Sequence, residues 1–195
     1  GIGLSVLFLS NGIIPFLSIL ITSFFLGFFS FWKNKRYAIF LGISLLVNLS
    51  IVGPWLLLFN ISDPSLFQLW ISQPILNSSP NFWYNLQGIA WFTWPAFPLA
   101  IWILCRDYQK IITQKKFLLP LVFILFYFTL ISFSPREDQI NWLPLIIPFC
   151  LLAVGSVDLL KRGYASALNW FGILIFGFFS FLIWLGWFAM QTGFP

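Results

Sequence analysis

Long apolar runs separated by short polar segments make up most of this chain. A partial run covers 1–10, and full runs lie near 13–32, 37–59, 89–105, 117–133, 140–157 and 168–190. A helix needs roughly 17 to 25 apolar residues to cross about 30 Å of hydrocarbon, and so many runs cannot all be buried in one small soluble core. The pattern therefore predicts an all-α fold, a polytopic transmembrane helix bundle of about six full spans and one partial span.

Basic residues gather in every second loop between these runs. The three clusters are Lys33, Lys35 and Arg36; Arg106, Lys110, Lys115 and Lys116; and Lys161 with Arg162. By the positive-inside rule these loops are cytoplasmic. The loops around Asn11, at 60–88 and at 134–139 then lie outside. We expect a multi-pass membrane protein.

Composition agrees with the membrane class and excludes several functions. Hydrophobic residues form 60% of the chain and charged residues 8%, against roughly a quarter charged in soluble domains. The net charge of +5 sits in short loops, where it sets topology, so no nucleic acid partner is expected. With no His and no paired cysteine spacing, we predict no metal site, no cofactor and no disulfide framework. Cys105 and Cys150 are expected to be packing residues.

The longest outside loop, 60–88, contains signals for a short helix near 64–72. Asp63 is placed as an N-cap, Pro64 takes the first helical position, and Pro74 follows a short apolar segment. These signals favour a helix lying on the outer membrane face over an irregular loop.

Prolines recur near the outer ends of the predicted spans, at Pro54, Pro95, Pro98, Pro144 and Pro148. Each removes a backbone donor, which a bilayer tolerates where neighbouring helices or a cavity satisfy the freed groups. The clustering suggests a cavity that opens outward. For any one proline the alternative is the general abundance of proline in membrane helices.

Three adjacent charged residues, Arg136, Glu137 and Asp138, stand in the short outside loop 134–139. A guanidinium there could bind a lipid phosphate through two hydrogen bonds, with the carboxylates orienting it or contacting a sugar hydroxyl. The alternative is a solvated turn, because runs of charged residues in loops are usually solvated. Tyr84, in the aromatic segment "NFWYNLQGIAWFTWP", likewise suits either an interfacial aromatic belt or a lipid or sugar platform.

Four segments, taken in order, resemble a known family. They are "GIGLSVLFLSNGIIP", "NFWYNL" with its following "WP", "PREDQINWLPLIIPFCLLAV", and "KRGYASALNWFGILIFGFFSFLIWLGWFAM". Together they resemble bacterial members of the dolichyl-phosphate-mannose protein mannosyltransferase group, which includes the aminoarabinose transferases that modify lipid A. These are GT-C-type membrane glycosyltransferases, and the resemblance extends along almost all of this chain.

The resemblance implies transfer of a sugar from a polyprenyl-phosphate donor to a lipid, glycan or protein acceptor on the outer face of the membrane. Arg136 and Tyr84 would then contact the donor phosphate, and the loop 60–88 would be a mobile cover. Glu137 and Asp138 would orient Arg136 or contact the sugar. Asn11 stands where the family has a Lys, which removes one expected phosphate contact.

In this family an acidic residue of the first outside loop is thought to act as base or to hold the acceptor. No matching segment occurs here, so the catalytic residue is not assigned, and 1–195 is expected to be one transmembrane domain from a longer chain. The alternative functions are a non-enzymatic transporter or flippase, or an accessory protein of envelope polysaccharide assembly. A transporter would be expected to show internal repeats or a polar path, and neither is seen; Asn48, the main polar residue deep in a span, could bond a neighbouring helix.

Overall fold

The computed structural model describes residues 1–30, 32–72, 80–106, 109, 114–134, 139–157 and 160–193. Within these ranges every regular element is a helix, which confirms the all-α prediction. The chain divides into two compact units, Gly1–Val154 and Gly155–Pro195. The expectation of one transmembrane domain stays a prediction.

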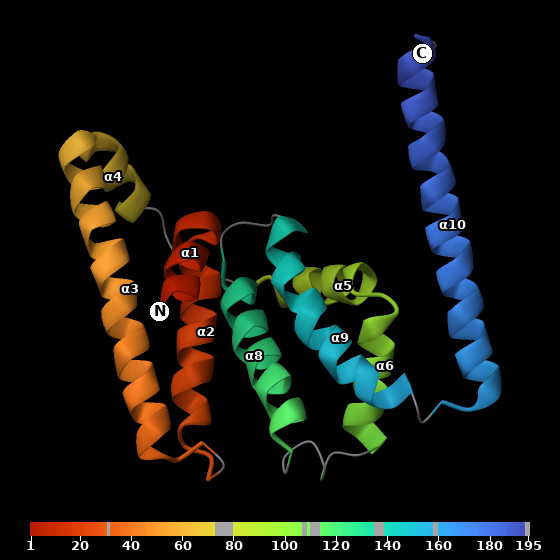
Figure 1. Ribbon diagram of the computed structural model, residues 1–195, viewed down its shortest axis with the longest axis horizontal. Helices are drawn as coiled ribbons and strands as arrows, with labels where there is room; N and C mark the ends of the chain where they lie inside the picture. The colour runs from red at the N-terminus through yellow and green to blue at the C-terminus, as the bar shows by residue number, and fades with distance from the viewer. Residues whose placement is uncertain are drawn as a thin grey trace. The chain divides into compact units, whose positions relative to one another are not determined.

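The first part of unit 1 is a group of four helices (Figure 1). They are α1 (Ile2–Asn11), α2 (Ile13–Leu26), α3 (Lys35–Ser62) and α4 (Pro64–Ser72). Helix α1 packs against α2 and α3, and α4 packs against α3. The break between α1 and α2 falls at Gly12, whose φ of 82° is in the left-handed region that glycine adopts without a steric cost.

The second part of unit 1 contains α5 (Phe82–Phe92), α6 (Ala96–Arg106), α8 (Lys115–Ser132), the 3-10 helix η1 (Gln139–Trp142) and α9 (Leu143–Val157), whose last residues fall beyond the unit boundary. Helix α8 joins the two parts because it packs against α2. The main core lies among α5, α6, α8 and α9, around Ile89, Ala100, Tyr127, Leu145 and Leu152.

Among the described residues, three helices are long and apolar enough to cross a membrane, namely α3, α8 and α10 (Arg162–Thr192). A fourth span is present if α5 and α6 together count as one. Helix α10, in unit 2, is about 46 Å long at 1.5 Å per residue and carries apolar side chains on all its faces, as membrane spans do. These helices indicate a membrane protein.

This count is lower than the predicted six full spans, because two of the full runs form shorter helices and a third is bent. The run 13–32 ends as a helix at Leu26, where Gly27 begins a series of turns. The run 140–157 begins with η1 and continues as α9, and the partial run 1–10 is α1. At 1.5 Å per residue, the 14 residues of α2 reach only about 21 Å.

The predicted span 89–105 is not one continuous helix. Helices α5 and α6 bend by 105° at residues 93–95. Pro95 offers no backbone donor, and a residue before a proline disfavours helical geometry, so the helix ends before Trp94 and starts again at Ala96. Helix α5 lies across the direction of α6 and α8 (Figure 1). It also takes in the last residues of the predicted loop 60–88.

Helix α4 occupies the range predicted for a short helix after Asp63. The Asp63 carboxylate accepts a hydrogen bond of 3.1 Å from the Leu66 backbone N–H and one of 2.6 Å from the Ser65 hydroxyl. Asn48 donates a hydrogen bond of 3.2 Å to Ser5 Oγ on α1, as expected for a polar residue between helices. The expected packing role of the cysteines is wrong, because Cys105 and Cys150 are both exposed.

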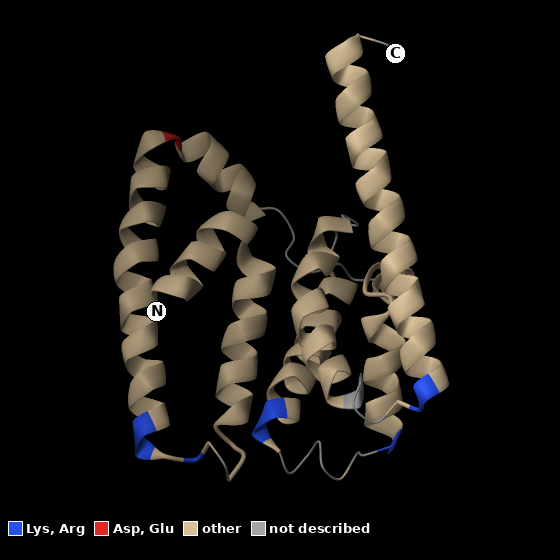
Figure 2. Ribbon diagram, turned by 45° about the vertical axis from the view of Figure 1, so that its right-hand side comes forward, with Lys and Arg blue, Asp and Glu red and all other residues tan. Residues whose placement is uncertain are grey.

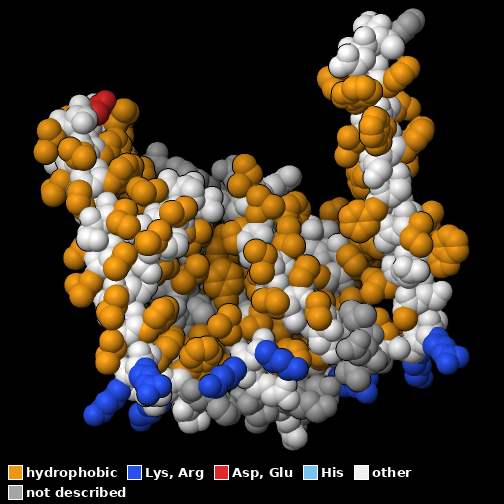
Figure 3. All heavy atoms as spheres, in the orientation of Figure 1, with side chains coloured by type: hydrophobic (Ala, Val, Ile, Leu, Met, Phe, Trp, Pro, Cys, Tyr) orange, Lys and Arg blue, Asp and Glu red, His pale blue; other side chains and the backbone are white. Residues whose placement is uncertain are grey.

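Charge within unit 1 is sorted by end (Figure 2). The described basic residues lie where α2 leads into α3, where α6 ends and where α8 begins. They are Lys33, Lys35, Arg36, Arg106, Lys115 and Lys116. Asp63 lies at the opposite end of α3. Between the ends, the face of unit 1 that Figure 3 shows carries mainly hydrophobic side chains. We call the first end the basic end.

Candidate functional site

The candidate site lies at the end of α8 that is remote from the basic end, where α5 crosses it. The Asn81 backbone N–H donates a hydrogen bond of 2.8 Å to the carbonyl oxygen of Ser132, the last residue of α8. The side chain of Asn85, one turn further along α5, donates to the carbonyl oxygens of Asn81 at 3.0 Å and Ile131 at 3.4 Å. Helix α5 is therefore held directly on the C-terminal turn of α8.

Trp142 connects the same helix to the segment after the charged loop. Its indole Nε1 donates a hydrogen bond of 3.0 Å to Asn85 Oδ1, and both side chains are buried. The ring packs over Gly88, where a Cβ atom would overlap it. On α8, the Tyr127 hydroxyl donates a hydrogen bond of 2.8 Å to the Asn141 carbonyl oxygen. The residues on both sides of 135–138 are therefore held in place. Ser132 is bonded to Asn81 at the start of α5, and Asn141 and Trp142 are bonded to α8 and α5.

Tyr84 is the predicted site residue whose position the structure describes. Its ring lies 5.7 Å from that of Trp142, centroid to centroid, at an angle of 53°. Tyr84 is 41% exposed, so it borders the buried Asn85–Trp142 pair without being enclosed. Arg136, Glu137 and Asp138 lie outside the described residues. The structure therefore brings Tyr84 close to Trp142, four positions after Asp138 in the sequence.

A groove of about 830 Å³ lies at the bend between α5 and α6. Its walls are almost entirely apolar, with three tryptophans and one amide side chain: Gln87, Ala90, Trp91, Trp94, Phe97, Pro98, Ile101, Trp102 and Cys105. Gln87 and Trp91 follow Tyr84 at spacings of three and seven residues, which places all three on one face of α5. A hydrocarbon chain held in this groove would reach toward Tyr84.

The site offers little acid–base chemistry of its own. Asp63 is the only carboxylate in the part of the chain that the structure describes, and it caps α4. The same part contains no group of three or more His, Cys, Asp or Glu that could hold a metal ion. The arrangement is suited to binding an apolar molecule with a polar head, and it assigns no general base.

Sequence reasoning missed Asn85, Gly88 and Trp142, which hold the site together. A signal was present for two of them, because an Asn and a Gly one turn apart in an apolar helix require a partner and close packing. Nothing local pointed to Trp142 as that partner, since it lies 57 positions from Asn85. Of the three groove tryptophans, Trp91 and Trp94 stood in the sequence only as part of an aromatic segment.

Comparison with known proteins gives no independent assignment. No family model, no curated protein and no solved structure matches the chain.

Proposed function

We propose that the chain is part of a membrane glycosyltransferase that transfers a sugar from a polyprenyl-phosphate donor to an envelope lipid, glycan or protein. The observation that carries the proposal is the position of Tyr84. It lies one turn before Gln87, a wall residue of the apolar α5–α6 groove, and its ring packs against Trp142, which follows the loop of Arg136 in the sequence. A polyprenyl tail fits the groove, and a phosphate at its head would meet the tyrosine hydroxyl and the guanidinium.

The topology proposed with this function has six spans in the bacterial cytoplasmic membrane. Counting α2, the α5–α6 pair and α9 as spans beside α3, α8 and α10 gives that number. The gathering of the described cations of unit 1 at one end supports a cytoplasmic basic end. The Tyr84 end would then face outward, with α4 on the outer membrane surface.

In the proposed reaction, the bond between the anomeric carbon of the sugar and the phosphate oxygen breaks, and an acceptor oxygen bonds to that carbon. The polyprenyl phosphate leaves with the bonding electrons, and the proton of the acceptor hydroxyl passes to a base. Arg136 would stabilise the charge that develops on the leaving phosphate, an effect that can contribute several kcal/mol. Tyr84 would orient the same phosphate.

The direct test uses the full-length protein in detergent with polyprenyl phosphate as the binding probe. Arg136→Ala should weaken binding by roughly tenfold or more, as loss of a charged hydrogen bond of about 1.5–3 kcal/mol implies. Tyr84→Phe should weaken it less. Arg36→Ala, at the basic end, is the control and should bind normally. Unchanged affinity for the well-expressed Arg136 variant would refute this role.

A second assay separates the enzyme from a flippase. Polyprenyl-phosphate sugars, including mannose and aminoarabinose forms, are offered on one side of proteoliposomes together with a membrane extract as acceptor. The proposal expects free polyprenyl phosphate and a sugar-modified acceptor. Intact donor recovered on the opposite leaflet, without cleavage, would favour the transporter.

A further inference from the structure

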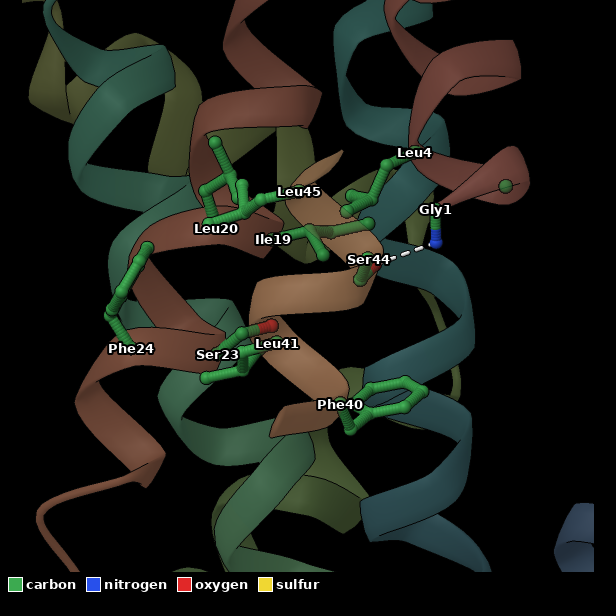
Figure 4. Close-up of a pocket in the computed structure, with 11 residues that line it drawn as sticks. Gly1, Leu4, Ile19, Leu20, Ser23, Phe24, Phe40, Leu41, Ser44 and Leu45 are labelled. Atoms are coloured by element: carbon green, nitrogen blue, oxygen red, sulfur yellow. Dashed lines mark hydrogen bonds between the residues drawn. The ribbon is translucent and has the colours of Figure 1, made fainter. Parts of the chain in front are cut away.

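A second site, unrelated to the α5–α6 groove, lies along α2. Two cavities adjoin there and share the lining residues Ile19, Ser23 and Phe40. The first, of about 300 Å³, lies among α1, α2 and α3 (Figure 4). The second, of about 350 Å³, lies among α2, α3 and α8 and includes Trp32 of the preceding turn. Each is at the lower end of the size range of small-molecule sites.

Both cavities have mainly apolar walls. The first is lined by hydrocarbon side chains such as Leu4, Leu20 and Leu45, together with Ser23 and Ser44, and Ser44 Oγ accepts a hydrogen bond of 2.6 Å from the Gly1 nitrogen (Figure 4). The second includes Thr22, Trp32 and Tyr37 in its wall and lies toward the basic end. The two cavities therefore adjoin, with the second nearer the charged end of unit 1.

Two polar atoms in the wall of the second cavity are buried without a hydrogen-bond partner. They are the Thr22 hydroxyl, on a residue only 4% exposed, and the Trp32 indole Nε1. Buried polar groups in native proteins are nearly always hydrogen-bonded, so each exception calls for a missing partner. The indole can only donate, and therefore the missing partner carries acceptor oxygens.

Among the residues that the structure describes, the charge around this cavity is positive and no acidic side chain balances it. Lys115 Nζ lies 5.5 Å from the centroid of the Trp32 ring. Lys33, Lys35 and Arg36 follow in the turn that leads into α3. The one described carboxylate, Asp63, is at the far end of α3. Acceptor oxygens with negative charge complement this surface, and in a membrane protein those belong to lipid phosphates.

We propose that these cavities bind one anionic phospholipid from the leaflet at the basic end. An acyl chain lies in the cavity among α1, α2 and α3, the ester oxygens face Thr22 and Trp32, and the phosphate pairs with Lys115. The exposed rings of Phe24 and Phe40, in the wall of the first cavity, open its side toward the surrounding lipid. This lipid is distinct from the proposed sugar donor, and its site does not depend on that function.

The test is made on the purified, delipidated protein with phosphatidylglycerol and phosphatidylcholine of identical chains. Native mass spectrometry counts the lipid molecules that the protein retains. Thermal unfolding measures how much each lipid stabilises the protein. Lys115→Gln should weaken phosphatidylglycerol retention about fivefold, the effect of removing one basic contact at a membrane surface. Lys116→Gln is the matched control, because its ammonium lies over Phe117 instead, and it should retain the lipid as the unmodified protein does.

The proposal is supported if phosphatidylglycerol is retained in preference to phosphatidylcholine and only the Lys115 change reduces that preference. Equal retention of the two lipids, or equal effects of the two lysine changes, would overturn it. Protection by inorganic phosphate equal to that by phosphatidylglycerol would also overturn it, because the site would then bind phosphate without a lipid. If the Lys115 variant does not fold, the retention of phosphatidylglycerol relative to phosphatidylcholine by the unmodified protein still tests the proposal.

Discussion

Trp142 donates its indole hydrogen bond to Asn85 across 57 positions of sequence, at 3.0 Å. The Asn85 side-chain amide donates hydrogen bonds to the carbonyl oxygens of Asn81 and Ile131. One side chain therefore connects α5, α8 and η1. A polar group buried at this depth is destabilising unless it is hydrogen-bonded, and here the bond holds Trp142, the last residue of η1, against α5. The orientation of α5 and the position of Tyr84 both depend on it.

Replacing Asn85 by Leu should lower the free energy of unfolding by about 1–3 kcal/mol, because the Trp142 Nε1 loses its acceptor while remaining buried. A thermal or denaturant unfolding series in detergent measures this cost. In the double-mutant cycle with Trp142→Phe, the coupling should be about 0.6–1.7 kcal/mol, as for other hydrogen bonds in membrane proteins. Strict additivity of the two changes would show that the bond contributes nothing.

Gly88→Ala should destabilise by about 1–3 kcal/mol, because a Cβ at this position would overlap the Trp142 ring and force it to move. Gly42→Ala is the control. Gly42 lies inside α3 with nothing within 4 Å of the added carbon. That change should stabilise by about 0.5–1 kcal/mol, since alanine loses less conformational freedom in a helix. Similar effects of the two substitutions on the unfolding temperature would contradict the packing argument.

The sequence was sufficient for the all-helical class and for some local features, but not for the number of spans. Asp63 followed by Pro64 is a start signal whose parts are adjacent, and a polar Asn48 deep in an apolar helix calls for a hydrogen-bond partner. Both depend on short-range chemistry, so a reader of the sequence can infer them. The same holds for the basic clusters, which mark one end of unit 1.

The bend at Pro95 could not be inferred in the same way. Helix α3 continues through Pro54 and α8 through Pro120, so a proline alone does not predict a break. Hydropathy reports how apolar a segment is but not the direction of its helix axis. The 89–105 run is apolar on both sides of the bend, so hydropathy does not reveal it. What decides the outcome is tertiary, because α5 is held across α8 by Asn81 and Asn85.

Ser5→Ala should lower the free energy of unfolding by about 0.6–1.7 kcal/mol, because Asn48 Nδ2 loses the hydroxyl that accepts its hydrogen bond between α1 and α3. Ser50→Ala is a matched control on the same helix, since that exposed hydroxyl bonds only the carbonyl of Val47. Unfolding in detergent followed by circular dichroism provides the comparison. If Ser50→Ala lowers the free energy of unfolding as much as Ser5→Ala does, the hydrogen bond between α1 and α3 makes no specific contribution to stability.

Acid should weaken the start of α4. The hydrogen bonds from the Ser65 hydroxyl and the Leu66 N–H hold the pKa of Asp63 below its ordinary value of 3.8. Because the folded pKa lies below the unfolded one, the carboxylate contributes its stabilisation fully at neutral pH and loses it as the pH falls through the folded pKa. The protection of the amide hydrogens in residues 64–68, relative to their intrinsic exchange rate at the same pH, should therefore fall below about pH 4. In Asp63→Asn, whose side chain still caps the helix but does not titrate, this acid-specific loss of protection should vanish. If protection in that variant falls as strongly on acidification, the Asp63 carboxylate is not the group responsible.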